Sequence, residues 1–188
     1  MKLLNIMFAT IAISIAMITA AKASAEVPEE SIYNISSKFL NTSGQEVSLS
    51  ELQGHPVVIS MAYTRCTYTC PLILSQMQQL EKELQKREIK DVRFVLVSFD
   101  PQNDTPQSLQ KYMEKKKLGS DWRLYTGKSD KSLREIANVL GIKYKKVEDG
   151  YFDHSFIITV LDNNGVIRGQ QVGADKDPKD LVKFIKGP

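Results

Sequence analysis

The chain has 188 residues, of which 42% are hydrophobic and 25% are charged, and its formal net charge at pH 7 is +3. This balance is that of one globular domain with a sizeable core. The small net charge excludes the strongly basic footprint of a nucleic-acid-binding protein. Two cysteines, Cys66 and Cys70, form one close pair, which is not the disulfide-dense scaffold of a small secreted domain.

The first 25 residues are typical of a secretory signal peptide. A short basic start precedes the apolar run LLNIMFATIAISIAMITA, and AKASA ends in the small residues that a signal peptidase recognises. An uncleaved membrane anchor is the alternative, because an apolar run of this length could span a bilayer. We therefore predict an exported, periplasmic protein in which residues 26–188 form one domain. The leader holds two of the 25 basic residues and none of the 22 acidic ones, so the predicted domain has a net charge of +1.

The first half of this domain predicts strands alternating with a helix. Residues 26–36 form a polar lead-in, and residues 37–52 indicate two short strands about a Ser-Gly turn. The β-branched, unbroken apolar run over residues 56–63 predicts a buried central strand. Apolar residues at helical spacing over residues 71–88 predict a helix with Pro71 as its first residue.

The second half continues in the same manner. Residues 92–99 predict a second buried strand, and residues 105–117 and 130–141 predict helices. Residues 155–172 predict a hairpin about an Asn-Gly turn, and residues 177–186 a closing helix. This order predicts an α/β sandwich of the thioredoxin kind, with a central mixed sheet flanked by helices and an N-terminal hairpin.

Both cysteines fall in the turn between the first central strand and its helix. They lie about one helical turn apart, close enough for a disulfide or for a shared ligand. A helix N-terminus also favours the thiolate. Dithiol oxidoreductases of this fold usually carry two residues between the cysteines and a proline before the facing strand. Here three residues intervene, and His154 and Ser155 precede that strand.

If His154 faces the cysteines, the chain offers two thiolates and one imidazole. This set suits copper, because soft sulfur holds Cu(I) and the nitrogen helps to hold Cu(II). Zinc accepts the same donors, but a closed structural zinc site normally has a fourth protein ligand, and the sequence offers no evident one. Position and spacing leave redox chemistry and metal binding both open.

Three stretches follow one another in a specific order: YTRCTYTCP, SFDPQNDTP, and DHS before a predicted strand. They resemble the YTxCxxxCP motif, the S-x-DPxxDTP motif and the metal histidine of the Sco/SenC family, the copper-binding factors for assembly of cytochrome c oxidase. The resemblance covers the whole predicted domain. It implies that Cys66, Cys70 and His154 bind one copper ion, and that the protein delivers it to an oxidase subunit or to another copper-acceptor protein.

Three further residues are candidates for supporting the site or for docking a partner. Many family members read Cys-Pro-Asp-x-Cys, whereas this chain has Thr-Tyr-Thr between its cysteines. The departure removes a negative charge near the metal and predicts Tyr68 at an exposed tip. Asp100 follows a central strand at the same sheet edge as the cysteines, and Asp153 precedes His154.

Two functions remain open at this stage. The first is copper delivery, which is not an enzymatic activity. The second is a thiol-disulfide reductase in which Cys66 and Cys70 form the redox-active catalytic pair and act on partner cysteines. A thiol peroxidase shares the fold, but the chain lacks a convincing threonine and arginine set around one cysteine.

Other residues that could bind a metal or a ligand are predicted to be structural. Met61 and Met77 fit a core strand and a helix face. A solvated turn at the end of the domain opposite the cysteines is predicted to hold His55. The remaining predictions are packing roles for Trp122 and Phe152, and a turn or helix-start role for Asp104.

Overall fold

The computed structural model describes residues 27–147 and 150–185. The predicted signal peptide or anchor, residues 1–25, lies outside the described residues. Within those ranges, no helix combines the length and the apolar character needed to cross a membrane.

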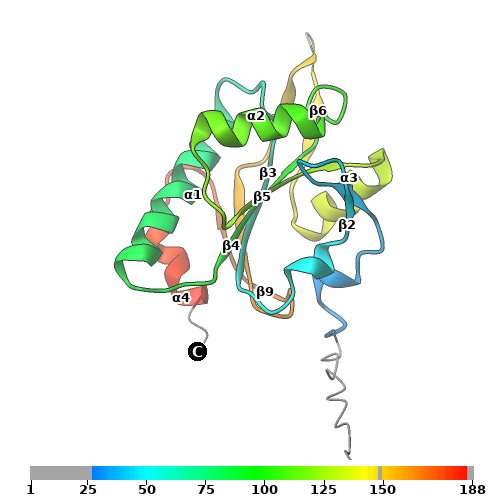
Figure 1. Cartoon of the computed structure of the whole chain (residues 1–188). Coiled ribbons are helices and arrows are strands. Elements are labelled where there is room, and N and C mark those ends of the chain that lie inside the picture. The colour runs from blue at the N-terminus through cyan, green and yellow to red at the C-terminus, as the bar shows by residue number, and fades with distance from the viewer. Residues whose placement is uncertain (1–26, 148–149, 186–188) are drawn as a thin grey trace, which may run out of the picture.

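A mixed sheet of seven strands forms the centre of the fold (Figure 1). The strands, in chain order, are β1 (Phe39–Leu40), β2 (Glu46–Val47), β3 (Val57–Ala62), β4 (Arg93–Ser98), β5 (Trp122–Gly127), β6 (Tyr144–Lys146), β7 (Phe152–His154), β8 (Ile157–Leu161) and β9 (Ile167–Val172). The sheet order is β2-β1-β5-β4-β3-β8-β9, and β6 pairs with β7 in a separate ribbon of two strands. Strands β3, β4 and β5 are parallel, whereas β1, β2, β8 and β9 are antiparallel to their neighbours.

Helices cover both faces of the sheet. They are α1 (Thr69–Lys86), α2 (Pro106–Lys116), α3 (Asp130–Val139) and α4 (Val182–Ile185), with the short 3₁₀ helices η1 (Ile32–Asn34), η2 (Leu49–Leu52) and η4 (Pro178–Leu181). One hydrophobic cluster joins α1, α2 and α4 to the sheet. A second cluster joins α3, η1 and η2 to the opposite face. The result is the predicted thioredoxin-like sandwich.

Alternation along the central strands explains why both faces are covered. In β3, Ile59 and Met61 contribute to the cluster under α3, and Val58 contributes to the cluster under α1. All three are 0% exposed. Successive strand residues point to opposite faces, so an unbroken apolar run requires cover on both sides. The predicted core positions of Met61 and Met77 are thus confirmed.

Most of the predicted elements are confirmed. These are the hairpins about Ser43-Gly44 and Asn164-Gly165, both central strands, and the helices that begin after Thr105 and Ser129. Thr105 caps α2 by accepting a hydrogen bond from the Ser108 N–H at 3.3 Å. The packing role of Trp122 is also confirmed, since its ring stacks on Phe94 with centroids 5.0 Å apart.

Three predictions need correction, and two features lacked a prediction. The lead-in is not merely polar, because η1 buries Ile32 and Tyr33 against the sheet. Helix α1 begins at Thr69, so Pro71 is its third residue; its missing N–H still costs no helical bond there. The closing helix is η4 followed by one turn of α4. Strand β5 and the β6–β7 ribbon were not predicted.

Helix α3 packs closely on the sheet where β5 ends. A Cβ added at Gly127 would lie 2.4 Å from Leu133 Cγ on α3. We expect Gly127→Ala to lower the free energy of unfolding by about 1–3 kcal/mol, because Leu133 must shift within a packed core. Urea denaturation measures this loss as a lower midpoint with an unchanged m-value.

Gly119→Ala is the matched control, since a Cβ there meets nothing within 4 Å. Its free energy of unfolding should stay within about 0.5 kcal/mol of the parent. Equal losses in the two variants would contradict the packing argument.

Candidate metal centre

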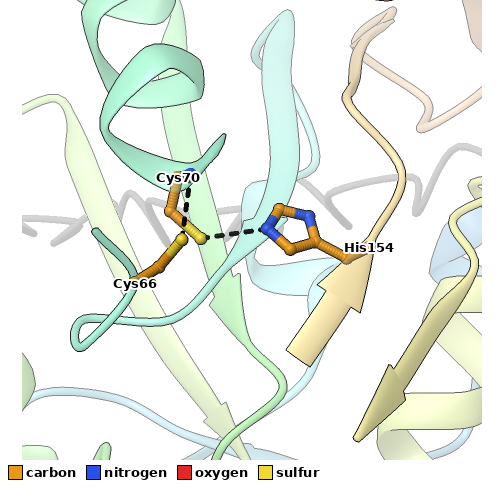
Figure 2. A group of neighbouring side chains, drawn as sticks. All are labelled: Cys66, Cys70 and His154. Atoms are coloured by element: carbon orange, nitrogen blue, oxygen red, sulfur yellow. Dashed lines mark hydrogen bonds between the residues drawn. The ribbon is translucent and has the colours of Figure 1, made fainter. Parts of the chain in front are cut away.

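Two loops meet at one edge of the sheet because β3 and β4 are adjacent and parallel. The loop after β3 carries Cys66 and leads into α1, whose second residue is Cys70. Strand β7 ends over the same edge with His154. Figure 2 shows the three side chains pointing toward one another from the loop, the helix and the ribbon.

The three candidate ligand atoms lie close together. Cys70 Sγ is 3.2 Å from His154 Nε2, and the Cys70 N–H donates to Cys66 Sγ at 3.3 Å. All three atoms lie within 4.8 Å of one another, and both cysteines are free thiols. Metal–nitrogen and metal–sulfur bonds are about 2.0–2.3 Å long, so one ion reaches atoms up to about 4.6 Å apart. Small side-chain adjustments therefore suffice for one ion to contact all three.

The tautomer of His154 is fixed by its neighbour. His154 Nδ1 lies 3.1 Å from the backbone oxygen of Ser155. A carbonyl oxygen only accepts, so Nδ1 carries the proton and the Nε2 lone pair points at the sulfurs. The rings of Phe99 and Tyr63 hold the imidazole in place, with centroids 5.1 and 6.2 Å from its own. The imidazole is thus oriented as a ligand before any ion arrives.

The two sulfurs have different environments. Cys70 is 1% exposed, and burial raises the pKa of its thiol although Sγ accepts the Tyr63 N–H at 3.3 Å. Cys66 is half-buried. Burial alone would raise the pKa of Cys66, but the N–H groups of Cys70 and Tyr68 stabilise its thiolate and lower the pKa overall. Cys66 is consequently the sulfur that ionises first and that solvent reaches.

Asp104 holds the loop that carries Cys66. Its side chain is buried and accepts the N–H of Thr64 at 2.9 Å, the Thr64 hydroxyl, and the Ser98 hydroxyl at 2.5 Å. Burial raises the pKa of this carboxyl against the opposing effect of these donors. The turn that begins α2 is thereby tied to the end of β3.

Asp100 holds the next residue of the same loop. Its carboxylate is buried and forms an ion pair with Arg65 at 3.0 Å, and it accepts two hydrogen bonds from the Asn103 amide, each of 3.0 Å. Arg65 also donates to the backbone oxygen of Gly150 at 3.4 Å. The ion pair therefore links the cysteine loop, the β4–α2 turn and the ribbon that carries His154.

The structure brings Cys66, Cys70 and His154 together. The three residues predicted to support the site or to dock a partner differ in how they relate to it. Asp100 reaches the cysteine loop through Arg65. Tyr68 is 80% exposed at the start of α1, which confirms the predicted exposed tip. Side chains alternate along β7, so the exposed Asp153 points away from the face that carries His154.

Sequence reasoning missed part of the surroundings of the site. Asp104 was assigned a turn or helix-start role, yet it is the buried acceptor for the cysteine loop. Tyr63 and Phe99 form an aromatic wall with Phe152, whose predicted packing role is confirmed. Tyr63 lies in the motif YTRCTYTCP, and Phe99 and Asp104 lie in SFDPQNDTP. Their place in these motifs is the signal that could have identified them. His55 lies before β3, at the opposite end of that strand.

The burial of His154 makes stability depend on pH. Burial lowers the pKa of His154, and the hydrogen bond to the Ser155 carbonyl and the charge of Asp153 oppose this only in part. The unfolded chain, with a histidine pKa of about 6.5, then binds the proton more readily, so stability is lost as the pH falls through that value. Between about pH 7.5 and about pH 5, we expect the reduced, metal-free protein to lose more free energy of unfolding than His154→Gln. Urea midpoints at the two pH values test this, and equal losses would contradict it.

The fold and the site define a thioredoxin-like protein with a CxxxC pair at a helix start and a histidine facing it. A sequence model of the family described as SCO1/SenC matches residues 26–187. The chain belongs to the SCO1/SenC family, which confirms the resemblance seen in its three motifs.

Individual relatives agree with this assignment. The SCO1 protein homolog of Bacillus subtilis is 36% identical over 152 residues, which are 79% of this chain and 78% of the homolog. The structure of BsSco, described as a member of the Sco family of cytochrome c oxidase assembly proteins with a disulfide switch, has a TM-score of 0.67 at 29% identity; the match covers 79% of this chain and 88% of BsSco. Arabidopsis thaliana ScoI with copper bound has the same fold, with a TM-score of 0.71 at 24% identity over 79% of this chain and 95% of ScoI.

Proposed function

We propose that this protein binds one copper ion through Cys66, Cys70 and His154 and delivers it during assembly of a respiratory oxidase copper centre. The observation that carries the proposal is the convergence of two thiols and one oriented imidazole within 4.8 Å. We further propose that residues 1–25 direct export, so that delivery takes place in the periplasm. Copper bound to a related fold, in ScoI of Arabidopsis thaliana, supports the choice of metal.

The donor set suits a cargo that must be released. Among the described residues, no fourth histidine, cysteine or carboxylate joins these three ligand atoms. Two sulfurs and one nitrogen satisfy Cu(I), and an unfilled position lets a ligand of an acceptor protein enter before the donors of this chain leave. Cys66 and His154 are half-buried, so an acceptor can reach the site from solvent.

Loading depends on the redox state of the cysteines. Both sulfurs must be reduced, and each must lose its proton, before it can bind a metal ion. An oxidising compartment favours a disulfide between cysteines this close. Copper binding and disulfide formation therefore compete for the same pair of sulfurs.

Histidine substitutions test the ligand assignment. We expect the reduced parent to bind one equivalent of Cu(II) in an oxygen-free titration, with a sulfur-to-copper charge-transfer band. His154→Ala should weaken binding by at least the roughly 10–100-fold that loss of a ligand's hydrogen-bond partner costs, and should alter the band, because here the donor itself is lost. His55→Ala is the control, since His55 lies at the opposite end of β3, and it should bind as the parent does. Unchanged affinity and spectrum in His154→Ala would refute the assignment.

A thiol-disulfide reductase is the second candidate, and the unequal burial of the two cysteines favours it. The thiolate of Cys66 would attack a partner disulfide, releasing one partner thiol and leaving a mixed disulfide. Cys70 would then displace the second partner thiol, so that two electrons pass to the partner and a Cys66–Cys70 disulfide remains. The disulfide switch described for BsSco supports redox chemistry at such a pair.

Alkylation of single-cysteine variants tests whether Cys66 is more reactive than the buried Cys70. In Cys70→Ser, the remaining Cys66 should react with iodoacetamide at least about tenfold faster than Cys70 does in Cys66→Ser, because Cys70 is 1% exposed. Mass spectrometry over time gives both rates. Urea-unfolded samples are the control, in which the two rates should converge. Equal rates in the folded proteins would remove the structural support for an attacking and a resolving cysteine.

A further inference from the structure

A groove begins beside the metal centre and runs between α3 and the β6–β7 ribbon. Figure 1 shows α3 and β6 on the same side of the molecule. The groove has a volume of about 590 Å³. Its walls come from one face of α3, from β6 and from the loop after β4. We call this space the basic groove, because Arg134, Lys143 and Lys146 line it.

The floor of the basic groove is aromatic and continuous with the site. Phe99, Tyr144 and Phe152 line it, with Phe99 and Tyr144 stacked at a centroid distance of 5.2 Å. The ring of Phe99 also lies 5.1 Å from that of His154. Residues opposite each other in the antiparallel ribbon share a face, so Tyr144 and His154 lie on the same side of it. A segment lying in the groove would thus reach the metal histidine at one end.

The rim of the basic groove is positively charged. Arg134 on α3, Lys143 directly before β6 and Lys146 on β6 are exposed and line it. None of the three forms an ion pair with a described residue. Among the described residues, the acidic ones that line the groove are Asp130, which is exposed, and Asp100, whose carboxylate is paired with Arg65. Cations therefore predominate here, although the chain as a whole is nearly neutral.

The outer edge of the ribbon favours an extended occupant. Val147 donates to Tyr151 and Ser155 donates to Lys143, each at 2.9 Å. In this register Tyr144 and Lys146 direct their N–H and C=O groups away from β7. Within the described residues, no third strand pairs with that edge. An added strand would find backbone partners on β6.

We propose that the basic groove binds an extended acidic segment of the copper-acceptor protein and brings that protein to His154 and Cys66. The assignment to an acceptor rests on the proposed copper function, whereas the preference for an acidic, partly aromatic segment rests on the groove alone. Carboxylates meet the three rim cations, and apolar side chains pack on the aromatic floor. Attraction between unlike charges fixes the register of such a segment and speeds its capture.

The test measures peptide binding to the reduced, copper-free full chain. The probe is a fluorescein-labelled peptide in which pairs of glutamates alternate with phenylalanine, and a peptide with lysine in place of glutamate is compared with it. Fluorescence anisotropy should show binding of the acidic peptide only, weaker at about 0.15 M than at about 0.01 M ionic strength. The double variant Lys143→Glu/Lys146→Glu should lower its affinity about tenfold or more.

The control variant is Lys82→Glu/Lys86→Glu, which makes the same change of charge at exposed positions on α1. Its affinity for the acidic peptide should change less than about twofold. Equal losses in both variants, or equal binding of both peptides, would overturn the groove assignment. If the parent formed a dimer that only the rim variant abolished, the groove would be an interface between two copies of the chain. That result would also overturn the proposal of an acceptor segment.

A copper titration of the same variants separates the two proposals. The rim variant should keep the copper stoichiometry of the parent, since neither lysine is a candidate ligand. Copper binding without peptide binding would reject the groove and leave the metal site standing. Peptide binding without copper binding would reject the copper function and the acceptor, and would leave only a groove for acidic segments.

Discussion

The buried carboxylate of Asp104 is the interaction on which the geometry of the site depends. It accepts both the N–H and the hydroxyl of Thr64, and so fixes the chain two residues before Cys66. A charged acceptor makes these hydrogen bonds strong, and an unpaired N–H in their place would cost about 1–3 kcal/mol. The Asp100–Arg65 ion pair extends the same attachment by one residue. Both acids follow β4, which runs parallel to β3 and beside it. The sheet therefore sets the distance between the turn that carries the two acids and the cysteine loop.

A loop held in this way can keep its two sulfurs unequal. Cys70 is buried on the first turn of α1, whereas Cys66 is half-buried with two N–H groups directed at it. The same inequality serves a reductase, which needs one attacking and one resolving cysteine, and a metal carrier, which needs one ligand that a partner can reach. The cysteine pair alone therefore does not separate the two chemistries. His154 favours the metal carrier, because an imidazole with its lone pair aimed at Cys70 Sγ, and within 4.8 Å of Cys66 Sγ, adds a donor that disulfide exchange does not require.

Sequence patterns predicted the elements whose signal is local. The unbroken run of β3 and the Asn-Gly hairpin were predicted correctly, and so was the position of both cysteines in the turn that leads into α1. Strand β5 was not predicted because Arg123 and Gly127 interrupt its apolar pattern. Its burial comes from pairing with β4, which the local sequence does not indicate. The β6–β7 ribbon was not predicted because β6 is only three residues long and contains two lysines. Asp104 looked like a helix-start residue because burial is a tertiary property: only the approach of the cysteine loop turns its carboxylate into an internal acceptor.

The three donors at the candidate centre come from three different kinds of segment. Cys70 is buried and belongs to a helix of 18 residues. Cys66 lies in a loop tied down by two carboxylates, through Thr64 and Arg65. His154 ends a ribbon of two three-residue strands that lies outside the main sheet, and the same ribbon forms one wall of the basic groove. A partner seated in that groove would therefore contact the element that carries His154. Docking in the groove and metal binding at His154 would then act through one piece of structure.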